Sequence, residues 1–214
     1  APVRSGLCMS FGFRFGRPID QLGPLSLAIG VAVVEALRKQ AGPGLGLKWP
    51  NDLMHQGDKL GGLLIEAQPD RSNGTRAVIG LGLNVNLPDH VHRTEPAVND
   101  RLEGRGWTDL RSVNDRDWSR TELAIDLALA VDRACERYLE LGFAPFYQRW
   151  ASVDALVGQW VTAESVSQDP IEGFARGVND LGELLIETES GWVSMSAGEV
   201  SVRFRTQAEN DLRQ

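Results

Sequence analysis

Two lysines, Lys48 and Lys59, lie at the ends of two predicted strands that are separated by a polar turn. Residues 46–49 favour a short strand closed by a proline, and residues 59–66 favour a second strand after the turn at 56–58. A hairpin of this kind brings both ammonium groups near one ligand, where they can offset the charge of an anion. The segment therefore predicts an anion site between the two strands.

Asn51 and Asp52 occupy the turn between these lysines and offer side-chain oxygen atoms. Carboxylate and amide oxygens suit a hard Mg²⁺ ion that is shared with a phosphate, so the pair are candidate metal ligands. A plainer interpretation is that both lysines are solvated and that Asn51 and Asp52 only form the turn.

A third predicted strand, residues 77–87, alternates between two kinds of residue. Side chains two apart share a face of a strand. One face carries small or amide residues (Gly80, Gly82, Asn84 and Asn86), and the other is apolar (Ile79, Leu81, Leu83 and Val85). The glycines leave room for a ligand against the backbone, and an amide can hydrogen-bond a phosphate or a ribose. Alternatively, the glycines accommodate a crossing helix or a large core side chain, and Gly61 and Gly62 invite the same two interpretations.

The remaining periodicities predict the elements that position these residues. Residues 7–11 favour a strand, 22–37 a core helix, 119–141 an amphipathic helix with a capping box at Ser119, and 144–150 a short helix, whereas 88–118 are polar with weak periodicity. Five short strands between 159 and 204 suggest a small barrel. The expected fold class is α+β: a mixed or antiparallel sheet with packed helices at 1–153, a small β-barrel at 154–207 and a tail at 208–214.

Composition restricts the partners and the compartment. The net charge of −7 argues against a broad DNA-binding surface. Cys8 and Cys135 show no paired spacing, so we expect two ordinary buried cysteines, Cys8 packing inward from its strand, in a reducing cytoplasm. No apolar run approaches the roughly 20 residues of a membrane span. The start at Ala1 lacks a methionine and lies close to a strand, so we expect the chain to begin inside a domain.

The motif Lys48-Trp49-Pro50-Asn51-Asp52-Leu53, followed by Lys59-Leu60-Gly61-Gly62, resembles the biotin–protein ligase family. Residues 6–10, 79–85 and 197–203 match family segments in the same order. The resemblance implies a class II synthetase-like fold with a C-terminal SH3-like barrel. It also implies a two-step reaction, in which biotin and ATP form biotinyl-5′-AMP and a lysine of a biotin carboxyl carrier protein then takes the biotin.

The resemblance also implies roles for single residues. Lys59 would contact biotin and the adenylate near the reacting bond, and Lys48 would lie near the phosphates. Gly61, Gly62 and Leu64 would line the biotin slot. The nucleotide side would comprise Lys48, Asn51, Asp52, Gly80, Gly82, Asn84, Glu199 and Arg203. For Glu199 and Arg203, which are four apart in a predicted strand, an exposed ion pair is the plainer alternative.

The chain departs from the family pattern at its start. The family's GRGRxGR loop, which orders over biotin and the adenylate, is absent from the 214 residues, as is the DNA-binding helix-turn-helix of some members. We therefore expect weak or absent biotin adenylation by this chain alone and no DNA binding. A homodimer is compatible with the sequence. The alternatives are a lipoate–protein ligase-like enzyme and a non-catalytic, biotin-responsive repressor or binding module.

Overall fold

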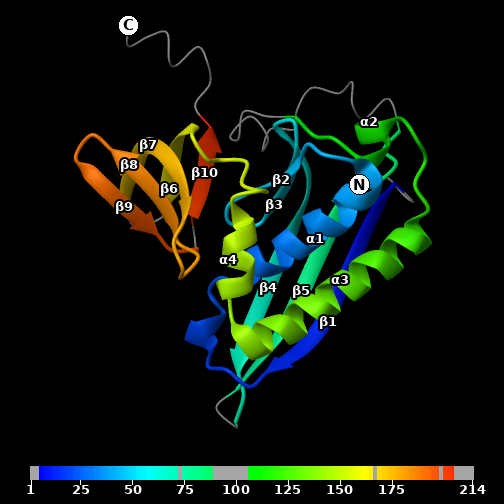
Figure 1. The fold of residues 1–214 in the computed structure, drawn as a ribbon, viewed down its shortest axis with the longest axis horizontal. Coiled ribbons are helices and arrows are strands. Elements are labelled where there is room, and N and C mark those ends of the chain that lie inside the picture. Colours follow the sequence, from blue (N-terminus) through cyan, green and yellow to red (C-terminus); the bar gives the residue numbers. More distant parts are fainter. Residues whose placement is uncertain (1–4, 72–73, 89–105, 166–167, 198–199, 205–214) are drawn as a thin grey trace, which may run out of the picture.

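The structure is a computed structural model that describes residues 5–71, 74–88, 106–165, 168–197 and 200–204. Two antiparallel five-stranded sheets are present, and helices cover one face of the first sheet (Figure 1). The α+β class is therefore confirmed, with an antiparallel rather than a mixed pairing in both sheets. Glu199 and the tail after 204 lie outside the described residues.

The first sheet has the strand order β1-β5-β4-β3-β2. Its strands are β1 (Gly6–Phe15), β2 (Leu45–Lys48), β3 (Asp52–His55), β4 (Asp58–Pro69) and β5 (Thr75–Asn84). The predicted hairpin was wrong in one respect: residues 52–55 form the extra strand β3, and Asp52 opens that strand. The reason is that the chain reverses within residues 49–51, which leaves room for β3 to pair with both β2 and β4.

Four helical segments pack against one face of this sheet or against one another. They are the 3₁₀ turn η1 (Ile19–Leu22), α1 (Leu25–Ala41), α3 (Arg120–Leu141) and α4 (Ala144–Trp150). The capping prediction is confirmed, since the Ser119 hydroxyl accepts from the Glu122 N–H and α3 ends at Gly142. The helix predicted from Leu22 begins later, because Gly23 and Pro24 interrupt it. A further short helix, α2 (Leu110–Asn114), lies in the polar stretch where no element was predicted.

Helix α1 is the apolar centre of the first domain. Among the described residues, Ile19–Ala41 is long and apolar enough, by length and composition alone, to cross a membrane. The expectation that no run approaches that length was therefore wrong. In the structure this helix packs on the sheet beside α3 (Figure 1), and nine of its residues are buried. A core helix with neighbours on two sides acquires this composition without a bilayer.

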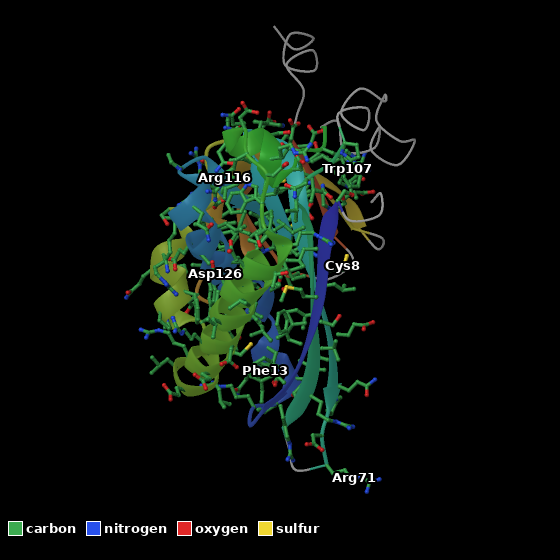
Figure 2. The ribbon with its side chains drawn as sticks, turned by 90° about the vertical axis from the view of Figure 1, so that its right-hand side faces the viewer. Cys8, Phe13, Arg71, Trp107, Arg116 and Asp126 are labelled. Carbon is green, nitrogen blue, oxygen red and sulfur yellow. The ribbon has the colours of Figure 1, made fainter. Side chains whose placement is uncertain are left out.

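The two faces of the first sheet differ sharply. In β5 the residues Ile79, Leu81 and Leu83 are buried under the helices, whereas Gly80, Gly82 and Asn84 are on the other face, as the alternation predicted. Figure 2 shows the helices on one side of the sheet and the Cys8 side chain on the opposite side. That second face, here called the open face, is available for ligands.

The second sheet has the order β10-β6-β7-β8-β9. Its strands are β6 (Trp160–Ser165), β7 (Gln168–Val178), β8 (Leu184–Thr188), β9 (Gly191–Met195) and β10 (Val200–Phe204). Strand pairing leaves β9 and β10 as edges, so closure into an SH3-like barrel and the domain boundary at 153/154 stay predictions. The sheets are joined by a buried contact in which the Trp49 indole N–H donates to the Gly182 carbonyl at 3.0 Å.

Asp154 connects the two parts of the chain. Its carboxylate accepts from the Trp150 indole at 2.9 Å and from the Leu156 N–H at 2.8 Å. Burial nevertheless raises the pKa of Asp154 above its ordinary value, and these hydrogen bonds offset only part of that shift. The ionised carboxylate therefore carries a desolvation cost in the folded chain at neutral pH.

The pH dependence of folding should reveal this cost. Because the folded pKa is raised, the cost is fully present above it and is relieved as pH falls through it towards the unfolded value. We expect the unfolding free energy of the native chain, minus that of Asp154→Asn, to rise between pH 7 and pH 4. Urea unfolding at several pH values measures this difference. A flat or falling difference would show that Asp154 is not strained by burial.

Two glycines on adjacent strands provide a matched test of packing. A methyl group at Gly61 would meet the Gly82 carbonyl oxygen at 2.2 Å, whereas at Gly82 the nearest atom, the Gly62 oxygen, is 4.0 Å away. Gly61→Ala should therefore cost about 1–3 kcal/mol of stability, because the backbone must shift. Gly82→Ala should change stability by less than about 0.5 kcal/mol. Denaturant unfolding distinguishes them, and equal losses would contradict the packing described here.

Candidate functional site

The site is organised by one row of residues that crosses all five strands of the first sheet. Strand registers place Cys8 opposite Gly82, Gly82 opposite Gly62, Gly62 opposite Asp52, and Asp52 opposite Lys48. Cross-strand partners share a face of the sheet, so all five belong to the open face. The row has glycines in its middle and a carboxylate–lysine pair at one end.

The glycines leave a shallow floor on the open face. Methyl groups at Gly80 and Gly82 would make at most ordinary contacts, 3.5 Å from the Leu64 oxygen and 4.0 Å from the Gly62 oxygen respectively. Within the residues that the structure describes, no helix or large core side chain crosses these two glycines, so the packing alternative finds no support there. Leu64 pairs with Gly80 and is 63% exposed, an apolar side chain beside the floor.

Gly61 differs from the other glycines. It pairs with Leu53 and Leu83, which are buried on the covered face, and the backbone of β5 excludes a side chain there. Its lack of a side chain is explained by close strand packing. A direct contact between Gly61 and a ligand stays a prediction.

Asp52 holds both candidate catalytic lysines. Its Oδ1 atom is 2.7 Å from the Lys59 ammonium, and its Oδ2 atom is 3.8 Å from the Lys48 ammonium. The side chain of Lys48 is 7% exposed and that of Asp52 13%, whereas Lys59 is 36% exposed. The predicted convergence of the two ammonium groups is confirmed, and the carboxylate between them is the group that keeps them together.

A β-bulge places Lys59 on this side of the sheet. Strict alternation from Gly62 would put Leu60 on the open face and Lys59 under the helices. The pairing of β3 with β4 instead shifts register between Leu53 and Met54, so that Leu60 is buried and Lys59 reaches Asp52. Bulges commonly re-aim a side chain beside a functional site.

The residues between Lys48 and Asp52 fix the turn. Trp49 is buried and bonds to the second sheet, and the Pro50 carbonyl accepts from the Ser26 hydroxyl of α1 at 3.1 Å. The Asn51 amide donates to the Leu63 carbonyl at 2.7 Å, and the Asn51 carbonyl accepts from the Leu63 N–H at 2.9 Å. Asn51 thereby joins the turn to β4.

This arrangement does not fit a resident magnesium ion on Asn51 and Asp52. The two carboxylate oxygens of Asp52 face ammonium groups, and the Asn51 amide is bonded to Leu63. No group of three or more His, Cys, Asp or Glu side chains that could hold a metal occurs in the described ranges. Any magnesium that arrives with a nucleotide would belong to that substrate.

Residues 106–108 lie beside Lys59, which the sequence did not predict. Lys59 N–H donates to the Gly106 carbonyl and Lys59 carbonyl accepts from the Thr108 N–H, both at 3.0 Å. Asn84 donates to the Thr108 carbonyl at 3.1 Å, so its amide holds this segment. Trp107 is 49% exposed there and offers a ring for a flat ligand. The available signal in the sequence was Trp107 itself, one of two tryptophans in the polar stretch 88–118.

Arg203 has a partner on the adjacent strand that the sequence did not predict. It forms an ion pair with Glu164 of the neighbouring strand β6, at 2.9 Å. The predicted partner, Glu199, lies outside the described residues, so the nucleotide roles of both stay predictions.

The expectation that Cys8 packs inward was wrong. Even-numbered residues of β1 lie on the open face, where Cys8 is exposed, while Cys135 of α3 is buried. Burial raises the pKa of Cys135 to about 12, with a smaller contribution from Asp132. The two thiols should therefore differ greatly in reactivity.

Thiol labelling tests this placement. We expect one cysteine of the native chain, Cys8, to react promptly with a disulfide reagent at pH 8, and Cys135 to react only after unfolding. Cys8→Ser should abolish the fast phase, and Cys135→Ser should retain it. Two fast thiols, or none, would contradict the placement of β1.

Two family matches to known proteins fall on the two parts of the chain that contain the first and the second sheet. Residues 5–84 match the Biotin/lipoate A/B protein ligase family, and residues 156–203 match the Biotin protein ligase C terminal domain. The bifunctional ligase/repressor BirA of Escherichia coli is 31% identical over 95% of this chain and 60% of its own length. The biotin–[acetyl-CoA-carboxylase] ligase of Mycobacterium tuberculosis is 30% identical over 94% of this chain and 70% of its own length.

Solved structures agree with these matches. The apo biotin protein ligase of Aquifex aeolicus superimposes with a TM-score of 0.77 at 27% identity, covering 94% of this chain and 83% of that one. The same enzyme in complex with biotin and ATP gives a TM-score of 0.76 at 28% identity, covering 94% and 79%. The two-sheet fold thus has solved counterparts among biotin protein ligases.

The chain belongs to the biotin protein ligase family. It spans about 60% of the length of the BirA proteins of Escherichia coli and Salmonella typhimurium.

Proposed function

We propose that this chain carries the nucleotide and lysine side of an ATP-dependent biotin–protein ligase. The observation that carries the proposal is the convergence of Lys48 and Lys59 on Asp52 at the edge of the glycine floor. The Aquifex aeolicus relative, which binds biotin and ATP, supports the choice of substrates.

Two positive groups beside an open floor suit the first chemical step. A biotin carboxylate oxygen attacks the α-phosphorus of ATP, the bond to the β-phosphate oxygen breaks, and pyrophosphate leaves. Lys59, the more exposed lysine, would lie by the reacting carboxylate and α-phosphate and offset their repulsion. Lys48 would lie towards the phosphates. Asp52 acts as a positioning residue, because it holds both ammonium groups before the substrates arrive.

The floor and its borders would hold the two substrates. Gly80 and Gly82 let the ligand lie against the backbone, and Gly62 and Leu64 border the slot for biotin. The exposed ring of Trp107 beside Lys59 is suited to stacking on a flat ring. In the second step, a lysine amine of the carrier protein attacks the biotinyl carbonyl and AMP leaves.

Biotin is favoured over lipoate by the second sheet. The family match over residues 5–84 includes both ligase types, whereas the match over 156–203 is to the C-terminal domain of biotin protein ligases. A biotin carboxyl carrier protein in the cytoplasm is the corresponding partner, and a homodimer is compatible with it. The preserved lysine–carboxylate cluster favours an enzyme over a non-catalytic binding module.

Formation of biotinyl-5′-AMP tests the proposal. The chain, together with any segment that its gene encodes beyond these 214 residues, is incubated with biotin, ATP, Mg²⁺ and pyrophosphatase, and phosphate release is measured. The same assay on the 214 residues alone tests the expectation of weak activity. Lipoate replaces biotin in a parallel reaction. Phosphate release with lipoate but not with biotin would reject a biotin ligase. The absence of release with either acid would reject it as well.

Lys59→Ala should reduce phosphate release about 100-fold or more, because charge stabilisation at the reacting atoms is lost. Stability should change by less than about 1 kcal/mol, since the ion pair with Asp52 is partly exposed. Arg14→Ala, which removes an exposed ion pair with Asp70, is the matched control and should retain activity. A large stability loss in Lys59→Ala with unchanged turnover would assign Lys59 a structural role.

A further inference from the structure

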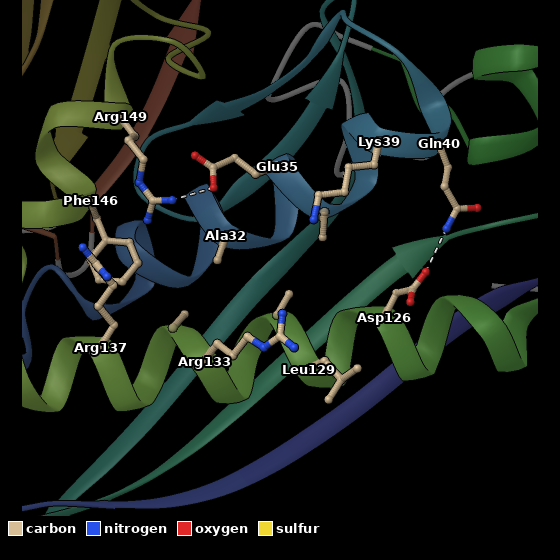
Figure 3. A pocket seen from close by; sticks show the side chains of 13 residues that line it. Ala32, Glu35, Lys39, Gln40, Asp126, Leu129, Arg133, Arg137, Phe146 and Arg149 are labelled. Carbon is tan, nitrogen blue, oxygen red and sulfur yellow. Dashed lines mark hydrogen bonds and ion pairs between the residues drawn. The ribbon is translucent and has the colours of Figure 1, made fainter.

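A groove of about 350 Å³ lies between α1, α3 and α4, on the helix-covered side of the sheet (Figure 3). Its base consists of small side chains on α1 and α3, namely Ala32, Ala36, Ala130 and Ala134. Small residues at a helix contact leave space that larger ones would fill. The groove is separated by the sheet from the glycine floor, so it is not part of the site described above.

Four cations line this groove: Lys39, Arg133, Arg137 and Arg149. Two carboxylates, Glu35 and Asp126, also line it, which leaves a local excess of positive charge in a protein whose net charge is −7. A net positive charge at this groove, on a protein that is acidic overall, favours an anionic ligand.

Both carboxylates are already engaged. Glu35 accepts from Arg149 at 2.7 Å, and Asp126 accepts from the Gln40 amide at 2.8 Å. Arg149 is further held by the Pro145 carbonyl at 3.1 Å. Among the described residues, neither acid forms an ion pair with Lys39, Arg133 or Arg137.

Lys39, Arg133 and Arg137 have no ion-pair or hydrogen-bond partner within the ranges that the structure describes. Arg133 and Arg137 are also one helical turn apart on α3, a spacing at which like charges repel. In Figure 3 the Arg137 side chain extends towards Phe146 of α4, whereas the Arg133 side chain runs along α3 in the direction of Leu129. Each guanidinium group offers paired N–H donors that match two oxygens of a phosphate or a carboxylate group.

We propose that this groove binds a small polyanion that carries two or more phosphate or carboxylate groups. The volume is at the lower end of the range for small-molecule sites, which suits a compact ligand rather than a whole nucleotide. The α1 helix that lines the groove also contacts the Lys48–Asp52 turn through Ser26, so the two sites share one rigid element. The inference does not depend on the proposed ligase activity.

Calorimetric titration of the chain with inorganic pyrophosphate and, separately, with citrate tests the proposal and distinguishes phosphate from carboxylate ligands. We expect saturable binding of at least one probe that weakens as sodium chloride is raised. The double variant Arg133→Gln/Arg137→Gln should bind at least tenfold more weakly. The control Arg71→Gln/Arg76→Gln, with the same loss of charge on the β4–β5 hairpin, should change affinity less than twofold.

The Lys59→Ala variant distinguishes anion binding in this groove from anion binding at the lysine site. This variant should still bind the probe, whereas Arg133→Gln/Arg137→Gln should not. Both arginines are exposed, and circular dichroism with a melting curve should show an intact fold in the double variant. If that variant does not fold, the two single variants replace it. Absence of binding by both probes, or binding that is insensitive to residues 133 and 137, would overturn the proposal.

Discussion

The double hydrogen bond between Asn51 and Leu63 is the constraint on which the candidate site depends. It ties the turn after β2 to the middle of β4, and therefore fixes how the short strands of the first sheet meet. Once this turn is fixed, Asp52 must lie opposite both Lys48 and Gly62. The carboxylate can then hold two ammonium groups that would otherwise repel each other.

The same turn connects the two parts of the chain. Trp49 precedes Asn51 and donates its indole N–H to Gly182 of the second sheet, while Pro50 receives a hydrogen bond from α1. A motif of five consecutive residues thus contacts the sheet, the central helix and the second sheet. Such a motif resists substitution for structural as well as chemical reasons, because each residue satisfies a different neighbour.

The two faces of the first sheet have different roles: one packs in the hydrophobic core, and the other carries the candidate site. Burial of the apolar face under α1 and α3 supplies stability. The open face then tolerates glycines, an exposed leucine and a reactive thiol, none of which contributes to that core. Substitutions at these open-face positions should therefore affect folding less than a substitution at Gly61, which faces the covered side.

The sequence alone determined the residue pattern on which this arrangement depends. Period-two alternation placed Gly80, Gly82 and Asn84 on one face, helical periodicity and capping located α1 and α3, and the motif from Lys48 to Gly62 indicated the family. These are local properties, because they depend on neighbours in the chain. The tertiary structure decided the features that depend on contacts between distant segments, which local sequence patterns cannot predict. The bulge that turns Lys59 towards Asp52, the approach of residues 106–108 to β4 and the exposure of Cys8 each depend on which distant segment pairs with which strand.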